Sequence, residues 1–471
     1  MSGGWVLILV VALAGCGSLP RINPNLAPRG NPSVQVDSAR GLLSPAQSKA
    51  VLERLKARGP DTTLLDRHLA FEEMIAGSPL TAGNKVTLLV DGPQTYASMF
   101  DAIGQARDHI NMETYILEED EVGKRFADVL LAKQAAGVQV NLLYDSVGAI
   151  KTSKAFFKRL SDGGIRVLEY NPVNPLTAKA GWDLNGRDHR KLLIADGRVA
   201  ILGGINISSV YSGGSLLGGS GGFGGSGVGS SAPQPPRDGV EGLPWRDTDL
   251  RIEGPVVEDL QKLFFETWEK QKGEPVPARA YYPAQLPAGK DVVRAIGSAP
   301  DEPFSRIYAT LISAIQHAQT DIWLTNAYFV PDPQLLASLK EAVARGVDVR
   351  LLLPSRTDSW LVLNAGRRFY GELLAAGVKI YERRDALLHS KTAVIDGVWS
   401  TVGSTNLDWR SFLYNQELNA VVVGPDFANQ MRAMFERDLQ ASEPITLAKW
   451  EGRPMEARLK EMLGAMWEQL L

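Results

Sequence analysis

Several features that would point directly to a class of function are rare or absent in this sequence. Its 471 residues include one cysteine, Cys16, which excludes an internal disulfide, a cysteine-rich zinc site and a C-x-x-C redox pair. Charge of one sign does not dominate either, because the formal net charge is only -3. The chain therefore lacks the basic field with which non-specific nucleic-acid-binding proteins collect phosphates, and nucleic acid is an unfavoured partner.

A long hydrophobic run is also missing near the N-terminus, where the apolar stretch covers only residues 5–14. A bilayer-spanning helix needs roughly 20 apolar residues, so this stretch predicts a signal peptide over residues 1–15. It ends in LAGC, which resembles the bacterial lipobox, whose cysteine becomes lipidated. We therefore expect a cell-envelope lipoprotein anchored in the membrane through Cys16 and facing the periplasm or exterior, with Gly17 favouring the outer membrane. The alternative is an ordinary secretory peptide, since no lysine or arginine precedes the run.

The length of the chain favours two folded lobes, because single domains mostly contain roughly 100–200 residues. Residues 17–45 are rich in proline, asparagine, glycine and serine, so we assign residues 16–50 to a tether after the lipidated cysteine. The first lobe is expected at residues 51–275 and the second at residues 276–471. Apolar residues at helical spacing from Met455 to Leu470 predict a C-terminal helix that docks on the second lobe, in preference to one that lies on a membrane.

The two expected lobes repeat one another. The segment AIGQARDHINMETYI (residues 102–116) is similar to AIQHAQTDIWLTNAYF (residues 314–329), and GVQVNLLY (137–144) is similar to GVDVRLLLP (346–354). In the first copy, strand-like runs at 110–117 and 138–144 enclose a helical pattern, which is the rhythm of a βαβ unit. These repeats predict an α/β fold.

The strongest match joins DHRKLLIADGRVAILGGINI (residues 188–207) to LHSKTAVIDGVWSTVGSTNL (residues 388–407). The two segments align without a gap, so that His, Lys, Asp, Gly and Asn fall in register. Farther on, residues 245–255 match residues 414–425, which pairs Asp247 with Glu417 and leaves extra residues in the first copy. A Gly/Ser-rich stretch at residues 212–237 accounts for them and predicts a mobile loop.

Each copy carries a histidine followed two residues later by a lysine: His189 with Lys191, and His389 with Lys391. On a strand these two side chains point to the same face. An imidazole that titrates near neutral pH can attack phosphorus or move protons, while a lysine neutralises the non-bridging oxygens of a phosphodiester. Two copies that face each other can therefore supply a nucleophile and an acid on opposite sides of one phosphate.

Two further pairs have chemistry that suits such a site. Asn206 and Asn406 can donate amide hydrogens to the phosphate oxygens. Asp247 and Glu417 are suited to orient the imidazoles and fix their tautomers by accepting a ring N–H.

The motif aspartates, Asp196 and Asp396, complete the set of candidate catalytic residues. They lie five residues after the lysines, on the opposite face if the strand continues. A structural ion pair or a turn contact near Gly197 and Gly397 explains them at least as well as direct chemistry.

With the element H-x-K-x-x-x-x-D followed by G-G/S-x-N and given twice, the sequence resembles the phospholipase D superfamily over roughly residues 80–445. Within it, GGINISSVYS (203–212) and WRDTDLRIEGPVV (245–257) are similar to bacterial cardiolipin synthases. The resemblance implies two pseudo-symmetric α/β/α lobes with the active site at their interface. It also implies a phosphohistidine intermediate, with His189 as nucleophile and His389 as acid and base, and it requires no metal or other cofactor.

The resemblance implies a phosphatidyltransferase that acts on membrane phospholipids, as cardiolipin synthases do when they join two phosphatidylglycerols. Phosphatidylglycerol is the favoured partner. One alternative is a phospholipase D that hydrolyses phospholipids, and another is a phosphodiesterase or nuclease acting on other substrates. A third is a non-enzymatic binding protein on a decayed scaffold, which the intact His, Lys and Asn of both copies oppose.

Overall fold

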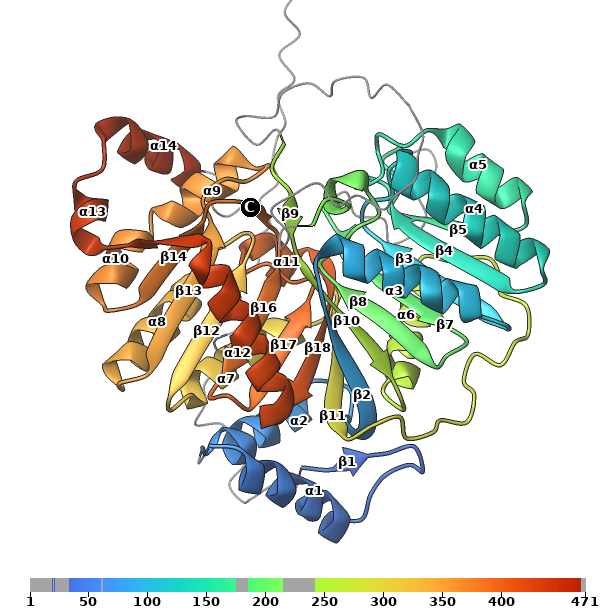
Figure 1. The fold of residues 1–471 in the computed structure, drawn as a ribbon, viewed down its shortest axis with the longest axis horizontal. Helices are drawn as coiled ribbons and strands as arrows, with labels where there is room; N and C mark the ends of the chain where they lie inside the picture. Colours follow the sequence, from blue (N-terminus) through green and yellow to red (C-terminus); the bar gives the residue numbers. More distant parts are fainter. Residues whose placement is uncertain are drawn as a thin grey trace, which may run out of the picture.

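The computed structural model describes residues 19, 21, 34–60, 62–174, 185–214 and 242–466. Within these ranges the chain forms two lobes side by side, the first coloured from blue to green and the second from yellow to red (Figure 1). The predicted signal peptide, Cys16 and Gly17 lie outside the described residues, as do residues 215–237 of the Gly/Ser-rich stretch.

The first lobe is built on a mixed sheet in the order β2-β10-β8-β7-β3-β4-β5. Its parallel strands are β3, β4 and β5, and the others pair antiparallel. The strands are β2 Leu80–Val90, β3 His109–Thr114, β4 Gln139–Asp145, β5 Arg166–Tyr170, β7 Leu192–Ala195, β8 Val199–Gly203 and β10 Thr248–Glu253. The helices that pack on this sheet are α3 Asp91–Gln105, α4 Glu121–Ala135, α5 Lys154–Asp162 and α6 Val257–Lys270.

The second lobe repeats this arrangement in the order β11-β18-β17-β16-β12-β13-β14, with β19 added at the edge. The strands are β11 Asp291–Ser298, β12 Asp321–Asn326, β13 Asp348–Pro354, β14 Lys379–Arg383, β16 Lys391–Ile395, β17 Trp399–Gly403, β18 Asn415–Val423 and β19 Ser442–Ile445. The helices are α7 Arg306–His317, α8 Pro333–Ala344, α9 Trp360–Arg367, α10 Tyr370–Ala375 and α12 Pro425–Gln440. Equal strand order and direction in the two lobes confirm the predicted α/β fold with two pseudo-symmetric halves.

The long strand β2 joins the two halves. Its C-terminal part pairs with β10 of the first lobe, and its N-terminal part pairs antiparallel with β11 of the second. One sheet of 17 strands therefore runs through both lobes. Because backbone hydrogen bonds continue across the junction, the relative position of the two motifs is fixed by the sheet itself.

Local sequence explains where the helices between these strands begin. Ser153 caps α5, Ser305 caps α7, and Asp332 caps α8 immediately before a proline at its first position. In each case the side-chain oxygen accepts a backbone N–H that the helix leaves unpaired. The motif strands β7 and β16 are buried along their whole length, as expected for strands covered on both faces.

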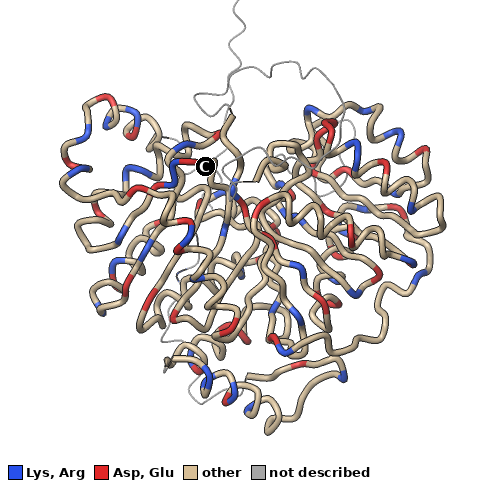
Figure 2. The backbone as a smooth tube through the Cα atoms, viewed as in Figure 1, with Lys and Arg blue, Asp and Glu red and all other residues tan. Residues whose placement is uncertain are grey.

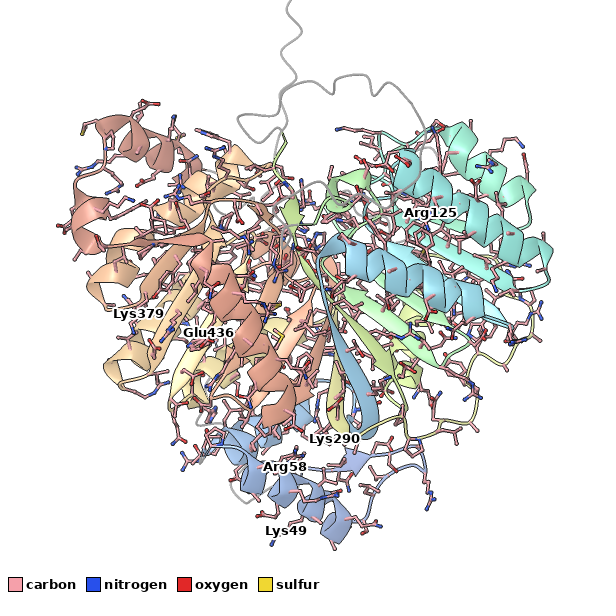
Figure 3. The ribbon with its side chains drawn as sticks, viewed as in Figure 1. Lys49, Arg58, Arg125, Lys290, Lys379 and Glu436 are labelled. Carbon is pink, nitrogen blue, oxygen red and sulfur yellow. The ribbon has the colours of Figure 1, made fainter. Side chains whose placement is uncertain are left out.

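The N-terminal part of the described chain packs against the second lobe. β1 (Val36–Asp37) pairs with β2, while α1 (Pro45–Arg58), a single π turn at Leu64–His68 and α2 (Leu69–Ile75) share one apolar core with α7, α8 and β11–β14. Asp426 at the start of α12 binds Arg58 at 2.8 Å and Lys290 at 2.6 Å, and both basic residues are labelled in Figure 3. The sequence assigns residues 16–50 to a tether and residues 51–275 to the first lobe. Residues 34–76 instead pack against the second lobe. The other lobe boundaries stay predictions.

The C-terminal helices α13 (Leu447–Glu451) and α14 (Met455–Ala465) lie at the edge of the second lobe, beside α10 and α9 (Figure 1). The sequence predicts a helix that docks on the second lobe, and α14 does contact α9 of that lobe. Its large apolar side chains do not make this contact. Met455, Leu459 and Met466 are among its most exposed side chains, and Leu470 lies outside the described residues. The spacing therefore identified the apolar side of this helix, and that side faces away from the protein.

Acidic and basic residues are interspersed along the backbone of both lobes in Figure 2, in line with the small net charge. Among the helices of the described residues, none is long and apolar enough to cross a membrane.

Candidate active site

The two motif histidines follow short strands that cross between the lobes. β6 (Arg187–Asp188) pairs in parallel with the start of β18, and β15 (Leu387–Leu388) pairs in parallel with β9 (Trp245–Arg246). The pairing continues into each motif, because His189 N donates to Gln416 O at 3.0 Å and His389 N donates to Arg246 O at 2.8 Å. Each histidine is therefore held in place by backbone of the opposite lobe.

The carboxylates that orient the two imidazoles also cross between the lobes. His189 Nδ1 lies 3.1 Å from both carboxylate oxygens of Glu417. His389 Nδ1 lies 2.6 Å from Oδ2 of Asp247. The structure thus brings each motif histidine together with the acidic residue of the other copy, so that neither lobe has a complete site on its own.

Burial and charge set the protonation of these pairs. Burial and the charge of Lys191 lower the pKa of His189 to about 4, and burial also lowers the pKa of His389. Burial by itself would raise the pKa of Glu417 and Asp247, but the facing histidines hold each carboxyl pKa below its usual range. At neutral pH each carboxylate can accept the Nδ1–H of a neutral imidazole, which leaves the Nε2 lone pair available for chemistry.

The motif lysines lie behind the histidines in buried positions. Lys191 Nζ donates to His189 O at 2.5 Å, and Lys391 makes the equivalent bond to His389 O. Burial lowers the pKa of Lys191 to about 7 and that of Lys391 to about 8. A bound phosphodiester anion would favour the charged form of both, because an opposite charge stabilises an ammonium group.

Both asparagines line the cavity that holds the histidines. Asn206 accepts from Ile116 N and donates to the Tyr211 hydroxyl, each at 3.1 Å, while the backbone N–H of Asn406 donates to Ser411 Oγ at 3.2 Å. These contacts fix the side chain of Asn206 and the backbone of Asn406 beside the reacting groups.

The motif aspartates do not reach this cavity. Asp196 accepts the backbone N–H groups of residues 107–109 at 2.8–3.0 Å, and Asp396 accepts those of residues 319–321 at 2.8–3.2 Å. Both residues have positive φ, 53° and 49°, in the turn after the motif strand. The structure therefore gives them the turn contact that was the alternative explanation, and it does not support their inclusion among the catalytic residues.

One cavity of about 500 Å³ lies between the lobes and is lined by both motif histidines and both motif asparagines. Sequence reasoning missed the other side chains that shape it. Those that lie closest to the histidines or carry charge are Tyr115, Glu118, Lys151, Arg187, Tyr211, Trp245, Tyr328, Asp358, Asp408 and Arg410. Trp245 and Arg187 stand beside the matched motifs and could have been noticed there, whereas Lys151 and Asp358 come from loops with no motif.

Glu417 has partners that Asp247 lacks. Ser404 Oγ donates to Glu417 at 2.5 Å, and Asn415 Nδ2 lies 3.3 Å from the same carboxylate. At the position equivalent to Ser404 the first copy has Gly204, where an added Cβ would come within 2.2 Å of Asp247. Asp247 therefore lies against a glycine that leaves room for it, whereas Glu417 accepts a hydrogen bond from a serine hydroxyl.

No three His, Cys, Asp or Glu side chains of the described ranges form a group that could hold a metal ion. Metal-independent chemistry stays a prediction, based on the lysines as the neutralising groups.

Comparison with known proteins agrees with this arrangement. The family model described as "Cardiolipin synthase, PLD-like domain" matches residues 99–211 and 311–439. The cardiolipin synthase of Geobacillus thermodenitrificans (strain NG80-2) is 34% identical over 427 residues, 90% of this chain and 79% of its own length. That of Alkalihalophilus pseudofirmus is 33% identical over 422 residues, 89% of this chain and 78% of its own length. The crystal structure of phosphatidylserine synthase from Haemophilus influenzae Rd KW20 shares the fold, with a TM-score of 0.59, 13% identity, and coverage of 86% of this chain and 100% of that one.

These relatives correct the predictions drawn from the N-terminus. Association with membranes and membrane phospholipid substrates are supported, but cardiolipin synthases are inner-membrane proteins. The predicted lipoprotein, its signal peptide and its outer-membrane destination are therefore wrong, and nothing supports an orientation toward the periplasm. A short apolar run ending in a cysteine was too little pattern to identify a lipidation site.

Two motifs in register, crossed histidine–carboxylate pairs in one cavity and relatives matched over most of the chain all point the same way. The chain belongs to the phospholipase D superfamily, as a cardiolipin synthase-like phosphatidyltransferase.

Proposed function

We propose that the enzyme transfers the phosphatidyl group of one phosphatidylglycerol to a hydroxyl of a second, through a phosphohistidine intermediate. The observation that carries this proposal is the pair of crossed contacts, His189 with Glu417 and His389 with Asp247, around one cavity. Two imidazoles with equivalent surroundings allow one to bond to phosphorus while the other moves protons.

In the first step, Nε2 of His189 attacks phosphorus of the donor lipid. The Nε2–phosphorus bond forms, the bond from phosphorus to the glycerol head group breaks, and protonated His389 gives its proton to the leaving glycerol oxygen. Lys191 and Lys391 neutralise the non-bridging oxygens, and Asn206 and Asn406 are placed to donate to them.

In the second step, the now neutral His389 takes the proton from a glycerol hydroxyl of the acceptor lipid. The acceptor oxygen bonds to phosphorus, the Nε2–phosphorus bond breaks, and His189 is regenerated as a neutral imidazole. The products are cardiolipin and one glycerol for each two phosphatidylglycerols, so atoms and protons balance.

The assignment of His189 as nucleophile is supported by the difference between the two imidazoles. The pKa of His189 is lowered to about 4, so its ring is neutral across the physiological range. Burial lowers the pKa of His389 as well, but its contact to its carboxylate is shorter, 2.6 Å against 3.1 Å, and Asp247 opposes that lowering. A bound phosphodiester anion shifts His389 further toward the acid form.

Phosphatidylglycerol as acceptor is supported by the cationic groups in the cavity wall. An acceptor lipid brings a second phosphate into the cavity, and Lys151, Arg187 and Arg410 line it there. Arg410 reaches across the interface to Asn185 O at 3.1 Å, two residues before Arg187. A second anion therefore meets cationic groups rather than bare apolar surface.

The test is to incubate the purified enzyme with vesicles of phosphatidylglycerol labelled in both glycerol groups and to resolve the products. Cardiolipin and free glycerol in equal amounts are expected, because a positioned acceptor outcompetes water for the phosphohistidine. Phosphatidic acid as the only lipid product would establish hydrolysis instead, and DNA cleavage with the lipids untouched would overturn the substrate class.

A further inference from the structure

Helix α14 packs on the protein through the face that a surface helix normally exposes. Its large apolar side chains point outward, with exposed fractions of 76% for Met455, 52% for Leu459, 59% for Met462 and 74% for Met466, the residue after its last turn. These four residues, which we term the apolar stripe, recur at intervals of four, three and four, and so lie along one side of a helix.

The opposite side of α14 is small or polar and is buried. A Cβ added to Gly464 would come within 2.6 Å of the backbone nitrogen of Ala365, which shows how closely α14 approaches α9. Glu461 is 5% exposed and forms a two-bond ion pair with Arg453, each bond at 2.7 Å. The orientation is therefore fixed by close backbone packing and a half-buried ion pair, and the apolar stripe has no partner among the described residues.

The apolar stripe lies at the same end of the molecule as residues that line the active-site cavity. α14 contacts α9, and α9 supplies Val362 to the cavity wall and Trp360, 39% exposed, to the surface. On the other lobe, Ile150 lines the same cavity and is 65% exposed. Figure 1 shows α14 and α9 at the same end of the molecule as β9, the strand beside His389, while α1 lies at the opposite end. Exposed apolar residues of both lobes thus flank the cavity.

We propose that the apolar stripe of α14, with Trp360 and Ile150, is the surface by which the enzyme sits on a lipid bilayer with its cavity facing the head groups. This inference rests on the proposed function, since a phosphodiester whose acyl chains stay in the bilayer reaches His189 only if the cavity entrance touches the membrane. Methionine-rich surfaces suit such a partner, because flexible thioether side chains adapt to a fluid apolar phase. A helix lying in the interface buries one apolar side and needs no membrane-spanning length.

Immersion of the stripe can be measured directly on the full chain. The only native cysteine is Cys16, so Cys16→Ser allows a single spin label at Met462→Cys. The matched control is Met74→Cys on α2 at the far end, a methionine of similar exposure, 50% against 59%. With phosphatidylglycerol vesicles, the label at position 462 should lose access to a water-soluble relaxation agent and gain access to oxygen. The label at position 74 should change in neither respect. Equal exposure to water at both positions would overturn the proposal.

A kinetic test separates docking from catalysis. The double variant Leu459→Gln with Met462→Gln should lower kcat/KM on phosphatidylglycerol vesicles by about tenfold or more, since two apolar side chains no longer enter the lipid. Its rate on a monomeric short-chain phosphatidylglycerol should equal that of the wild type, and Met74→Gln should match the wild type on both substrates.

Each other outcome has a distinct meaning. Wild-type rates of the double variant on vesicles would overturn the docking surface, and so would a change in oligomeric state by light scattering, which would make a second copy the partner of the stripe. Failure of the wild type to turn over the short-chain lipid would count against the proposed function and leave the label measurement to decide the docking surface.

Discussion

The two sides of the active-site cavity have the same catalytic groups and different walls. Each side has a buried histidine, a lysine bonded to the histidine carbonyl and a carboxylate from the other lobe. Around His389 the wall is aromatic and acidic, with the rings of Trp245, Tyr211 and Tyr328 at 5.2, 6.1 and 6.2 Å from the imidazole and with Asp358 bonded to Tyr328. Around His189 there is one ring, Tyr115 at 5.1 Å, and the basic Arg187, which is paired with Asp145. Lys151, Arg410 and the acidic Glu118 line the same cavity.

This contrast indicates how a symmetric scaffold can assign asymmetric roles. A repeated fold supplies two equal imidazoles, and sequence repetition by itself cannot say which one attacks phosphorus. The walls differ in charge, and Asp358 beside His389 favours the acid form of that histidine. Variants of the catalytic groups and of the cavity wall test these separate roles.

The largest effect is expected from removal of either imidazole. His189→Ala and His389→Ala should each lower kcat by roughly 10³-fold or more, because both steps require both rings. Since the two act in one mechanism, the double variant should be scarcely slower than either single variant. Steady-state rates on phosphatidylglycerol vesicles check this, with circular dichroism to confirm folding. Near-wild-type turnover in one single variant would show that the motifs do not share a site.

The crossed carboxylates should come next. Asp247→Asn and Glu417→Gln keep the shape of each side chain but can present an amide N–H to the imidazole, which favours the wrong tautomer, so kcat should fall by roughly 10²–10⁴-fold. Asp196→Asn is the matched control, because its carboxylate accepts backbone N–H groups away from the cavity. It should lower the melting temperature and leave kcat of the folded enzyme unchanged. A large loss of kcat in Asp196→Asn would return this aspartate to the catalytic set.

The pH dependence should show the two histidines separately. Neutral His189, with a pKa lowered to about 4, is required, so kcat/KM should fall as the pH drops through about 4. Protonated His389 is also required, and burial lowers its pKa, so kcat/KM should fall as the pH rises, beginning below the ordinary histidine value. A synthetic donor with a p-nitrophenol leaving group needs no acid. With it, the alkaline fall should move up to about 7, where Lys191 loses its proton. An unchanged alkaline limb would remove His389 from the role of acid.

The smallest effect is expected at the basic wall. Arg410→Gln should raise KM for phosphatidylglycerol as acceptor by roughly three- to tenfold, the loss of one partly exposed charge–phosphate contact. Transfer to free glycerol, a neutral acceptor, should not change when the donor is saturating. Lys158→Gln, at a surface lysine paired with Asp162, is the control for loss of one positive charge. Equal losses with both acceptors would show that the wall does not select an anionic acceptor.

Much of this arrangement could be predicted from the repeat. Segments in register at His189 and His389 gave the two lobes, the paired motifs and the acidic partners, because residues that match across a repeat occupy matching places in a pseudo-symmetric fold. The crossing of Asp247 to His389 and of Glu417 to His189 was not predictable, since it depends on strand pairing between lobes that are distant in sequence.

Other parts of the structure could not be predicted from the sequence, also for physical reasons. Helical spacing marked the apolar side of α14 but not whether that side faces the protein, because a buried ion pair and a glycine can hold a helix as firmly as an apolar stripe. The helices α1 and α2 precede the first motif in sequence yet pack on the second lobe, a long-range contact that no local pattern reports. Lys151, Tyr328 and Asp358 of the cavity wall come from loops, where side-chain type carries little information on position.

The most direct test of the division between the two histidines is to trap the covalent intermediate. In His389→Ala, the p-nitrophenol donor should still give a burst of one p-nitrophenol per enzyme, because this leaving group needs no acid and the base for the second step is missing. Mass spectrometry after alkaline quenching should then place the phosphatidyl group on His189, and His189→Ala should show neither burst nor adduct. A burst in His189→Ala with the adduct on His389 would contradict the account and reverse the roles of the two halves.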